Sequence, residues 1–294
     1  MKQYYLFLIL PILFVSPHSY SQISYRYPVV FEQVERYSSF INPSEVSTDS
    51  HKAGIVLSNQ NLLGPFNNIR TFIGQGFFTL NKDSIKKSKI GANFYSDKEG
   101  SYISNTRGYL TYSYQLSIAP NLQIASALAI GISTITYQNS QSSNSTSASA
   151  LDGNLSLALV QNRFRFCFGI NQFPQQTVFL IDERLTFKRY YSFYAVKNLD
   201  INYALRLNFI GMFSLKSNQV TDINFTSSLI VKKHFNIGLG YWFNRGIITL
   251  VGFDNIIIQK NTFRFVFSYS LPLLTSSTYL NQEQIALAIG YNFR

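Results

Sequence analysis

Large apolar residues alternate with small or polar ones along much of this chain, and this period of two constrains the fold more than any other feature. The alternation is clearest in residues 284–293. One parity holds Ile285, Leu287, Ile289, Tyr291 and Phe293, and the other holds Gln284, Ala286, Ala288, Gly290 and Asn292. Because successive side chains of a β-strand point to opposite faces, the segment is predicted to be a strand with one apolar face.

Three further segments place arginine on one face and aromatic or aliphatic side chains on the other. They are residues 163–168 with Arg163 and Arg165, residues 203–209 with Arg206, and residues 261–269 with Arg264. A half-buried strand of a soluble sandwich is one interpretation of each segment alone. A strand with lipid outside and a polar lumen inside is the other, and arginine opposite a wholly apolar face favours it.

No stretch after residue 22 has the 18 or so apolar residues of a transmembrane helix. The nearest, residues 122–135, is interrupted by Gln123, Ser126, Ser133 and Thr134. Lipid cannot hydrogen-bond the open edge of a sheet, so a membrane protein without such helices has to close its strands into a barrel.

Ten more segments have strand-like composition, which predicts an all-β fold: a transmembrane antiparallel β-barrel of about 14 strands, in one domain over residues 22–294. These segments are 53–61, 69–80, 88–96, 106–117, 121–137, 151–161, 186–197, 221–232, 235–243 and 246–258. Turn-forming residues separate them, among them Asp83-Ser84, Lys197-Asn198 and Lys260-Asn261. The Ser- and Asn-rich tract 138–150 and residues 172–183 are predicted to be long loops.

Residues 1–21 are predicted to be a signal peptide. Lys2 precedes an apolar run over residues 4–15, and Ser19-Tyr20-Ser21 supplies small residues before a cleavage site. The apolar run is shorter than the roughly 20 residues of a spanning helix, although a membrane anchor is the alternative. A chain that is 46% hydrophobic but only 13% charged fits export to a membrane.

Residues that carry enzyme chemistry are few, and no catalytic, cofactor-binding or metal-binding residues are expected. The single cysteine, Cys167, excludes an internal disulfide framework and is predicted to be a small buried lumen residue. His51 and His234 lie beside lysines at predicted strand ends, where solvated histidines are expected. Asp182-Glu183, followed by Arg184, is predicted to form a loop ion pair rather than a catalytic dyad.

The net charge of +11 raises the question of an anionic partner. Residues 82–89 hold a basic cluster in a predicted turn, and export favours anionic lipid or an acidic partner over nucleic acid. The inward-facing Arg163, Arg165, Arg206 and Arg264 have two interpretations. They either line an anion-selective lumen or pair with inward carboxylates and close a narrow one.

Four blocks of the chain resemble, in order, those of the PorP/SprF family. Residues 37–44 resemble its opening Q-Y-x-x-N-P-A-x-x-G, with Ser44-Glu45 departing from the usual small residues. Residues 91–100 resemble its G-x-x-x-x-x-D-x-x-G hairpin, residues 111–116 its Y-A-Y-x-L strand, and residues 289–293 its closing L-G-Y-N-F strand. The family consists of outer-membrane proteins of the Bacteroidetes type IX secretion and gliding machinery.

The resemblance implies a non-enzymatic barrel of the cell outer membrane that supports secretion or surface anchoring of a large cognate cargo or adhesin. Its implied partners are that secreted protein, other type IX secretion components and outer-membrane lipid. Asn42 and Pro43 are predicted to dock the partner chain, because proline biases the residue before it toward an extended conformation. An ordinary turn into the first strand is the alternative for this motif. The alternative function is a diffusion channel or hydrophobic-solute transporter of the FadL kind.

Overall fold

The computed structural model describes residues 39–48, 51–62, 70–83, 85–99, 102–138, 145–180, 183–216, 219–243, 246–272 and 283–293. The chain divides into two units, residues 1–31 and 32–294, and every described residue belongs to the second. The predicted signal peptide therefore lies outside the described residues.

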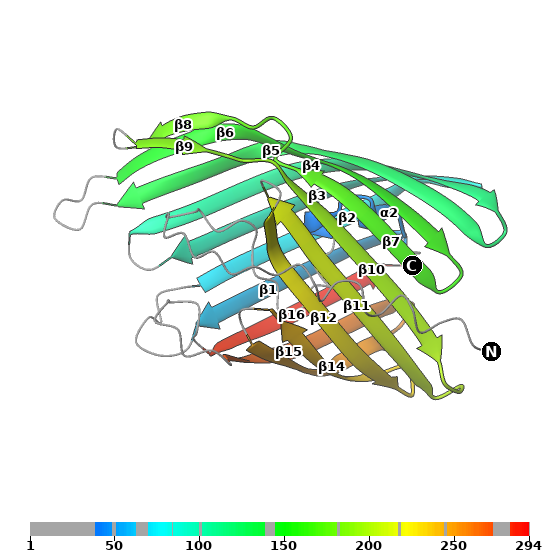
Figure 1. The fold of residues 1–294 in the computed structure, drawn as a ribbon. Helices are drawn as coiled ribbons and strands as arrows, with labels where there is room; N and C mark the ends of the chain where they lie inside the picture. Colours follow the sequence, from blue (N-terminus) through cyan, green and yellow to red (C-terminus); the bar gives the residue numbers. More distant parts are fainter. Residues whose placement is uncertain are drawn as a thin grey trace. The chain divides into compact units, whose positions relative to one another are not determined.

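Fourteen antiparallel strands of the second unit close into a barrel (Figure 1). β1 pairs with β16 to close it, and β7 pairs with β10, since β8 and β9 form a separate two-stranded sheet. The strands are β1 (Ala53–Leu62), β2 (Arg70–Lys82), β3 (Lys86–Glu99), β4 (Ile103–Ala119), β5 (Leu122–Gln138), β6 (Ser145–Gln161), β7 (Phe164–Asn171), β8 (Thr177–Leu180), β9 (Glu183–Thr186), β10 (Tyr190–Asp200), β11 (Leu205–Lys216), β12 (Gln219–Val231), β13 (Phe235–Trp242), β14 (Gly246–Ile258), β15 (Asn261–Pro272) and β16 (Gln284–Phe293). The predicted barrel of about 14 strands is confirmed.

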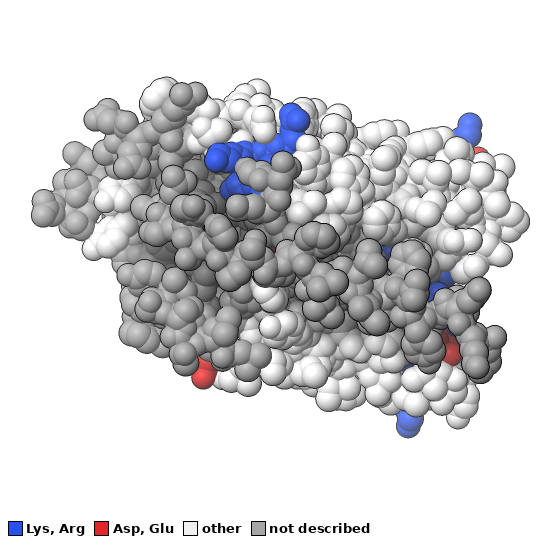
Figure 2. Space-filling model, viewed as in Figure 1, with Lys and Arg blue, Asp and Glu red and all other residues white. Residues whose placement is uncertain are grey.

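The two faces of the barrel wall differ as the alternation predicts. In β16, Ala286, Ala288 and Asn292 are buried on the inner face, whereas Leu287 and Ile289 are exposed on the outer one. The same parity runs through the other strands, so small and polar side chains face inward and large apolar ones face outward. On the face drawn in Figure 2, the described residues form a largely uncharged surface with a few charged side chains. Lipid around the barrel explains why so much apolar surface stays exposed.

The connections differ in length between the two ends of the barrel. At one end, called here the short-turn end, strands are joined by residues 83–85, 120–121, 162–163, 201–204, 232–234 and 259–260. The opposite, long-loop end has all the long connections, residues 63–69, 139–144, 172–189 and 273–283, together with the short ones 100–102, 217–218 and 243–245. Because outer-membrane barrels have short periplasmic turns, the short-turn end faces the periplasm.

Several predicted turns and loops are wrong. Lys86–Lys89 begin β3 and pair with β4, and Lys197-Asn198 lie inside β10 and pair with β7 and β11. Residues 145–150 of the predicted loop 138–150 pair with β5, and β8 lies within the predicted loop 172–183. The reason is common to all four: once a neighbouring strand offers hydrogen-bonding groups, polar residues extend the ladder although their composition favours turns.

Candidate functional site

The inner side of the barrel holds residues 39–48, called here the lumen segment, which contain the predicted docking residues Asn42 and Pro43. Ser39 to Val46 are all buried. The amides of Glu45 and Val46 donate to the carbonyls of Asn42 and Pro43, at 3.0 and 3.1 Å, and begin the single turn of α2 (Glu45–Thr48). No helix among the described residues has the length and apolar character needed to cross a bilayer.

Aromatic rings hold the first part of the lumen segment against β3 and β4. Phe40 is 2% exposed, and its ring centroid lies 5.6 Å from that of Tyr95 and 5.5 Å from that of Tyr109. Both spacings are those of favourable tilted or edge-on aromatic pairs, each worth about 0.5–1.5 kcal/mol beyond area burial. Ser39 adds a hydrogen bond of 2.5 Å from its hydroxyl to Gln75 Oε1 on β2. The segment is therefore anchored on this side mainly by apolar packing.

Polar contacts fix Asn42 on the other side of the segment. Asn42 is fully buried, and its Oδ1 accepts a hydrogen bond of 3.0 Å from the hydroxyl of Ser192 on β10. The same hydroxyl accepts from Asn171 Nδ2 of β7 at 2.9 Å. Gly169 of β7 lies next to both side chains, and because it has no Cβ it leaves the space that Asn42 and Ser192 occupy. Glycine is needed here for close approach rather than for backbone conformation.

An ion pair joins the last part of the segment to β7. Glu45 Oε2 lies 3.2 Å from Arg165 Nε, and Glu45 Oε1 accepts a hydrogen bond of 2.7 Å from the thiol of Cys167. The glutamate side chain is only 4% exposed. The neighbouring Ser44 amide donates to the hydroxyl of Ser156 on β6 at 2.7 Å. A carboxylate buried to this degree requires the arginine, because an uncompensated buried charge is strongly destabilising.

Replacing Gly169 by alanine is expected to dislodge Asn42. The added Cβ would lie 2.4 Å from Asn42 Oδ1 and 2.6 Å from the Ser192 hydroxyl, closer than real contacts allow. Over-packing of this kind costs about 1–3 kcal/mol, which a lower unfolding temperature of the purified barrel would report. Gly108→Ala is the control, since nothing lies within 4 Å of a Cβ at that position. Equal effects of the two substitutions would contradict the placement of Asn42 against Gly169.

A second group of buried polar side chains adjoins the lumen segment through Tyr109. Its hydroxyl donates to Asp152 Oδ2 of β6 at 2.7 Å. Arg107 lies on the same face of β4 and is only 2% exposed. Its Nε donates a hydrogen bond of 3.2 Å to Asn105 Oδ1, and its Cζ lies 5.9 Å from the centroid of the Tyr95 ring. Asp152 and Tyr190 of β10 lie near Arg107. Side chains from β3, β4, β6 and β10 thus converge inside the barrel at this level.

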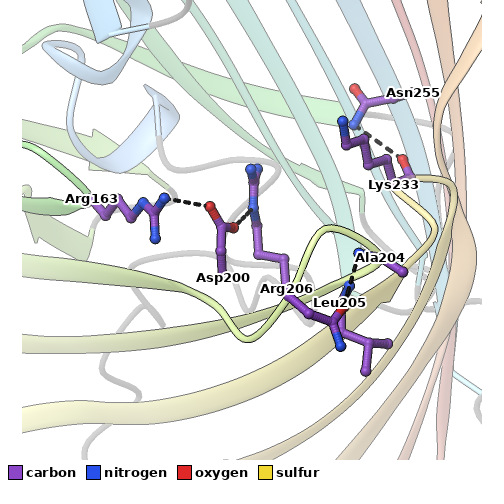
Figure 3. A network of polar contacts seen from close by, with 8 residues as sticks. Arg163, Asp200, Ala204, Leu205, Arg206, Lys233 and Asn255 are labelled. Carbon is purple, nitrogen blue, oxygen red and sulfur yellow. Dashed lines mark hydrogen bonds and ion pairs between the residues drawn. The ribbon is translucent and has the colours of Figure 1, made fainter.

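The predicted lumen arginines fall into different places. Arg163 and Arg206 meet at Asp200 at the short-turn end, with N–O distances of 2.7 Å each, as Figure 3 shows. All three side chains are partly exposed, at 57%, 49% and 29%. Arg165 pairs with Glu45 as described above. Arg264 lies on β15, on the inner parity between the buried Thr262 and Val266.

The two histidines lie next to strand ends. His51 precedes β1, and its Nε2 lies 3.2 Å from the Thr262 hydroxyl, while His234 is exposed in the turn between β12 and β13. Cys167 is fully buried on the inner face, as expected. Asp182 lies outside the described residues, and the side chains of Glu183 and Arg184 are not described. Within the described ranges, no three His, Cys, Asp or Glu side chains gather as a metal site would require.

Glu45, Arg107 and Asp152 are buried charged residues that sequence reasoning did not single out. All three lie on the inner side of the barrel. For Arg107 and Asp152, the alternation of inward and outward residues along β4 and β6 predicts this position. The signal for Glu45 was that acidic residues are scarce in this chain, which has only 14 of them to balance 25 lysines and arginines. An acid next to the Asn-Pro motif was therefore a candidate partner for one of the inward arginines.

Comparison with known proteins agrees with this architecture. The family model for the type IX secretion system membrane protein PorP/SprF matches residues 23–291. The chain belongs to the PorP/SprF family. It is therefore an outer-membrane component of the type IX secretion system, and its fold is that of a secretion or transport barrel. No curated protein matches the chain.

Solved structures with a similar fold are outer-membrane transporters and channels. The toluene transporter TbuX of Ralstonia pickettii has a TM-score of 0.59 at 11% identity, over 88% of this chain and 94% of TbuX. The monoaromatic hydrocarbon channel CymD gives 0.57 at 10% identity, over 88% and 93%. A FadL homologue of Pseudomonas aeruginosa gives 0.55 at 9% identity, over 88% and 94%. At such identities the likeness concerns the fold alone.

Proposed function

We propose that this barrel holds a cognate secreted protein at the cell surface as a non-enzymatic partner of the type IX secretion system. Family membership places it in that system, and the lumen segment carries the proposal further. Residues 39–46 contact β2, β3, β4, β6, β7 and β10 by packing, hydrogen bonds and an ion pair. A lumen segment that contacts six strands makes the barrel interior rigid, and this suits a platform for a partner better than an open conduit.

Two regions are proposed to take part in holding the partner. Asn42 and Pro43, both buried, are proposed to act indirectly: Pro43 stiffens the lumen segment, and this segment supports the barrel wall that the partner contacts. The β8–β9 sheet, at the long-loop end that faces the outside, offers a second contact. Its Phe179 is 72% exposed. An exposed aromatic ring outside the barrel wall is a common anchor for protein partners.

Purification of the tagged barrel from outer membranes in mild detergent tests the proposal. We expect one large secreted protein to dominate the co-purified material, identified by mass spectrometry. Deleting the barrel should then remove that protein from the cell surface while bulk secretion continues, as measured by surface labelling. Phe179→Ser should weaken co-purification, with Phe253→Ser, another exposed phenylalanine but on the barrel wall, as the matched control. Unchanged surface display after deletion would overturn the proposal.

A channel for hydrophobic solutes is the second candidate, favoured by the fold shared with hydrocarbon transporters. The two functions differ in what the purified barrel does in a planar bilayer. A platform with a braced lumen segment should show no steady ion conductance and no solute uptake into liposomes. Steady conductance of the unmodified barrel, together with no captured partner, would favour the channel.

A further inference from the structure

A groove crosses the lipid-facing side of β10 to β13. Its volume is about 540 Å³, within the range of about 300–1,000 Å³ that ligand pockets span. The floor is formed by Ala195, Gly211 and Ser227, the small residues among the outward positions of their strands. The walls are large and exposed: Phe164, Phe209, Phe225, Leu239 and Tyr241. Small floor residues between large walls leave room for an extended apolar chain.

Lys197 lies at one end of this groove, and it is the one charged residue among those that line it. In the strand ladder it stands directly between Phe164 of β7 and Phe209 of β11, all three on the outer face. Other outward-facing charged side chains described on the barrel strands, Arg70, Lys86 and Lys98, lie within one residue of a strand end. No described acidic residue forms an ion pair with Lys197. A cation at this place is costly in lipid unless an anion meets it.

We propose that the groove binds an anionic phospholipid of the periplasmic leaflet, with its headgroup on Lys197 and an acyl chain between the aromatic walls. Lys197 is three residues from the end of β10 at the short-turn end, a distance of about 10 Å along the strand. A lysine side chain at that depth reaches the headgroup level by extending toward the interface. The leaflet follows from the short-turn end, which faces the periplasm.

A second lipid-facing groove on β2 to β5 provides an internal comparison. It is lined by Gly76, Phe78, Ala92, Leu110 and Leu128 among others, has a volume of about 700 Å³ and contains no charged side chain. Any annular lipid should enter both grooves alike. A preference for an anionic headgroup should arise only at Lys197, because the second groove offers no cation to attract it.

Native mass spectrometry of the full barrel, exchanged from detergent into micelles doped with phosphatidylglycerol or phosphatidylcholine, tests the proposal. We expect the first bound lipid to be phosphatidylglycerol, with an affinity about fivefold higher than for phosphatidylcholine, the preference that one lysine near a headgroup confers. Lys197→Gln should abolish this preference, and Lys197→Arg should retain it. Added glycerol 3-phosphate should not displace the lipid, because the acyl chain also contributes to binding.

Substitutions that fill one groove or the other distinguish binding of a specific lipid from general solvation of the barrel by annular lipid. Ala195→Phe should remove phosphatidylglycerol binding, whereas Ala92→Phe in the uncharged groove should leave it intact. Retained heat-modifiable migration on gels shows that each variant has folded, and Lys197→Gln provides the test if Ala195→Phe does not fold. Equal binding of the two lipids, or a preference that survives Lys197→Gln, would overturn the proposal. Competition by a co-purified protein for the groove would likewise overturn it in favour of a protein partner.

Discussion

Replacing Arg165 by methionine is expected to release the lumen segment from the barrel wall. The substitution keeps an unbranched side chain but removes the Arg165 guanidinium from the Glu45 carboxylate, which is only 4% exposed. Removing one partner of a buried ion pair costs about 3–5 kcal/mol, and Arg165, 25% exposed, places this pair near the lower end. The segment avoids that cost by leaving the wall. Hydrogen exchange of the amides of residues 39–46 should accelerate by on the order of a hundredfold.

The matched control is Arg163→Met, in the turn two residues before Arg165. Arg163 is more than half exposed and pairs with Asp200 at the short-turn end, so its loss should leave exchange of the lumen segment unchanged. Glu45→Gln provides the reciprocal test, since it removes the buried charge rather than its partner and should have the smaller effect. Slow exchange of residues 39–46 in the Arg165→Met variant would show that the ion pair does not hold the segment.

Replacing Leu110 by arginine is expected to destabilise the barrel in the membrane by about 2–4 kcal/mol. Leu110 lies near the middle of β4 and is 74% exposed on the lipid-facing side. An arginine there would have to stay in the hydrocarbon region or distort the bilayer around it. Urea unfolding of the barrel from liposomes, followed by Trp242 fluorescence, measures the change in the free energy of unfolding.

Ile118→Arg serves as the control for depth. Ile118 has the same outward parity and is 55% exposed, but it is the last residue but one of β4. An arginine close to the interface should cost no more than about 1 kcal/mol. A similar cost at both positions would contradict the assignment of the middle of β4 to the membrane interior.

Strand positions and faces could be predicted because each depends on local alternation. The period of two in residues 284–293 and 261–269 predicts which side chains face lipid, and β16 and β15 have those faces. Strand ends were harder to predict. Lys197-Asn198 and residues 145–150 have turn-like composition, yet both continue their strands because a neighbour supplies hydrogen-bonding partners. Such partners are distant in sequence, so composition alone does not reveal them.

Local sequence patterns predicted the barrel, its approximate number of strands and its inner and outer faces, because these follow from short-range alternation and from the absence of long apolar helices. The contents of the lumen, in contrast, depend on contacts between distant parts of the chain. The pairing of Glu45 with Arg165 and Cys167 joins residues about 120 positions apart, and the Asn42–Ser192 hydrogen bond spans 150. Charge and hydrogen-bonding capacity are visible in a sequence. The distance between two such groups is set by closure of the barrel, which brings β7 and β10 against a segment that precedes β1.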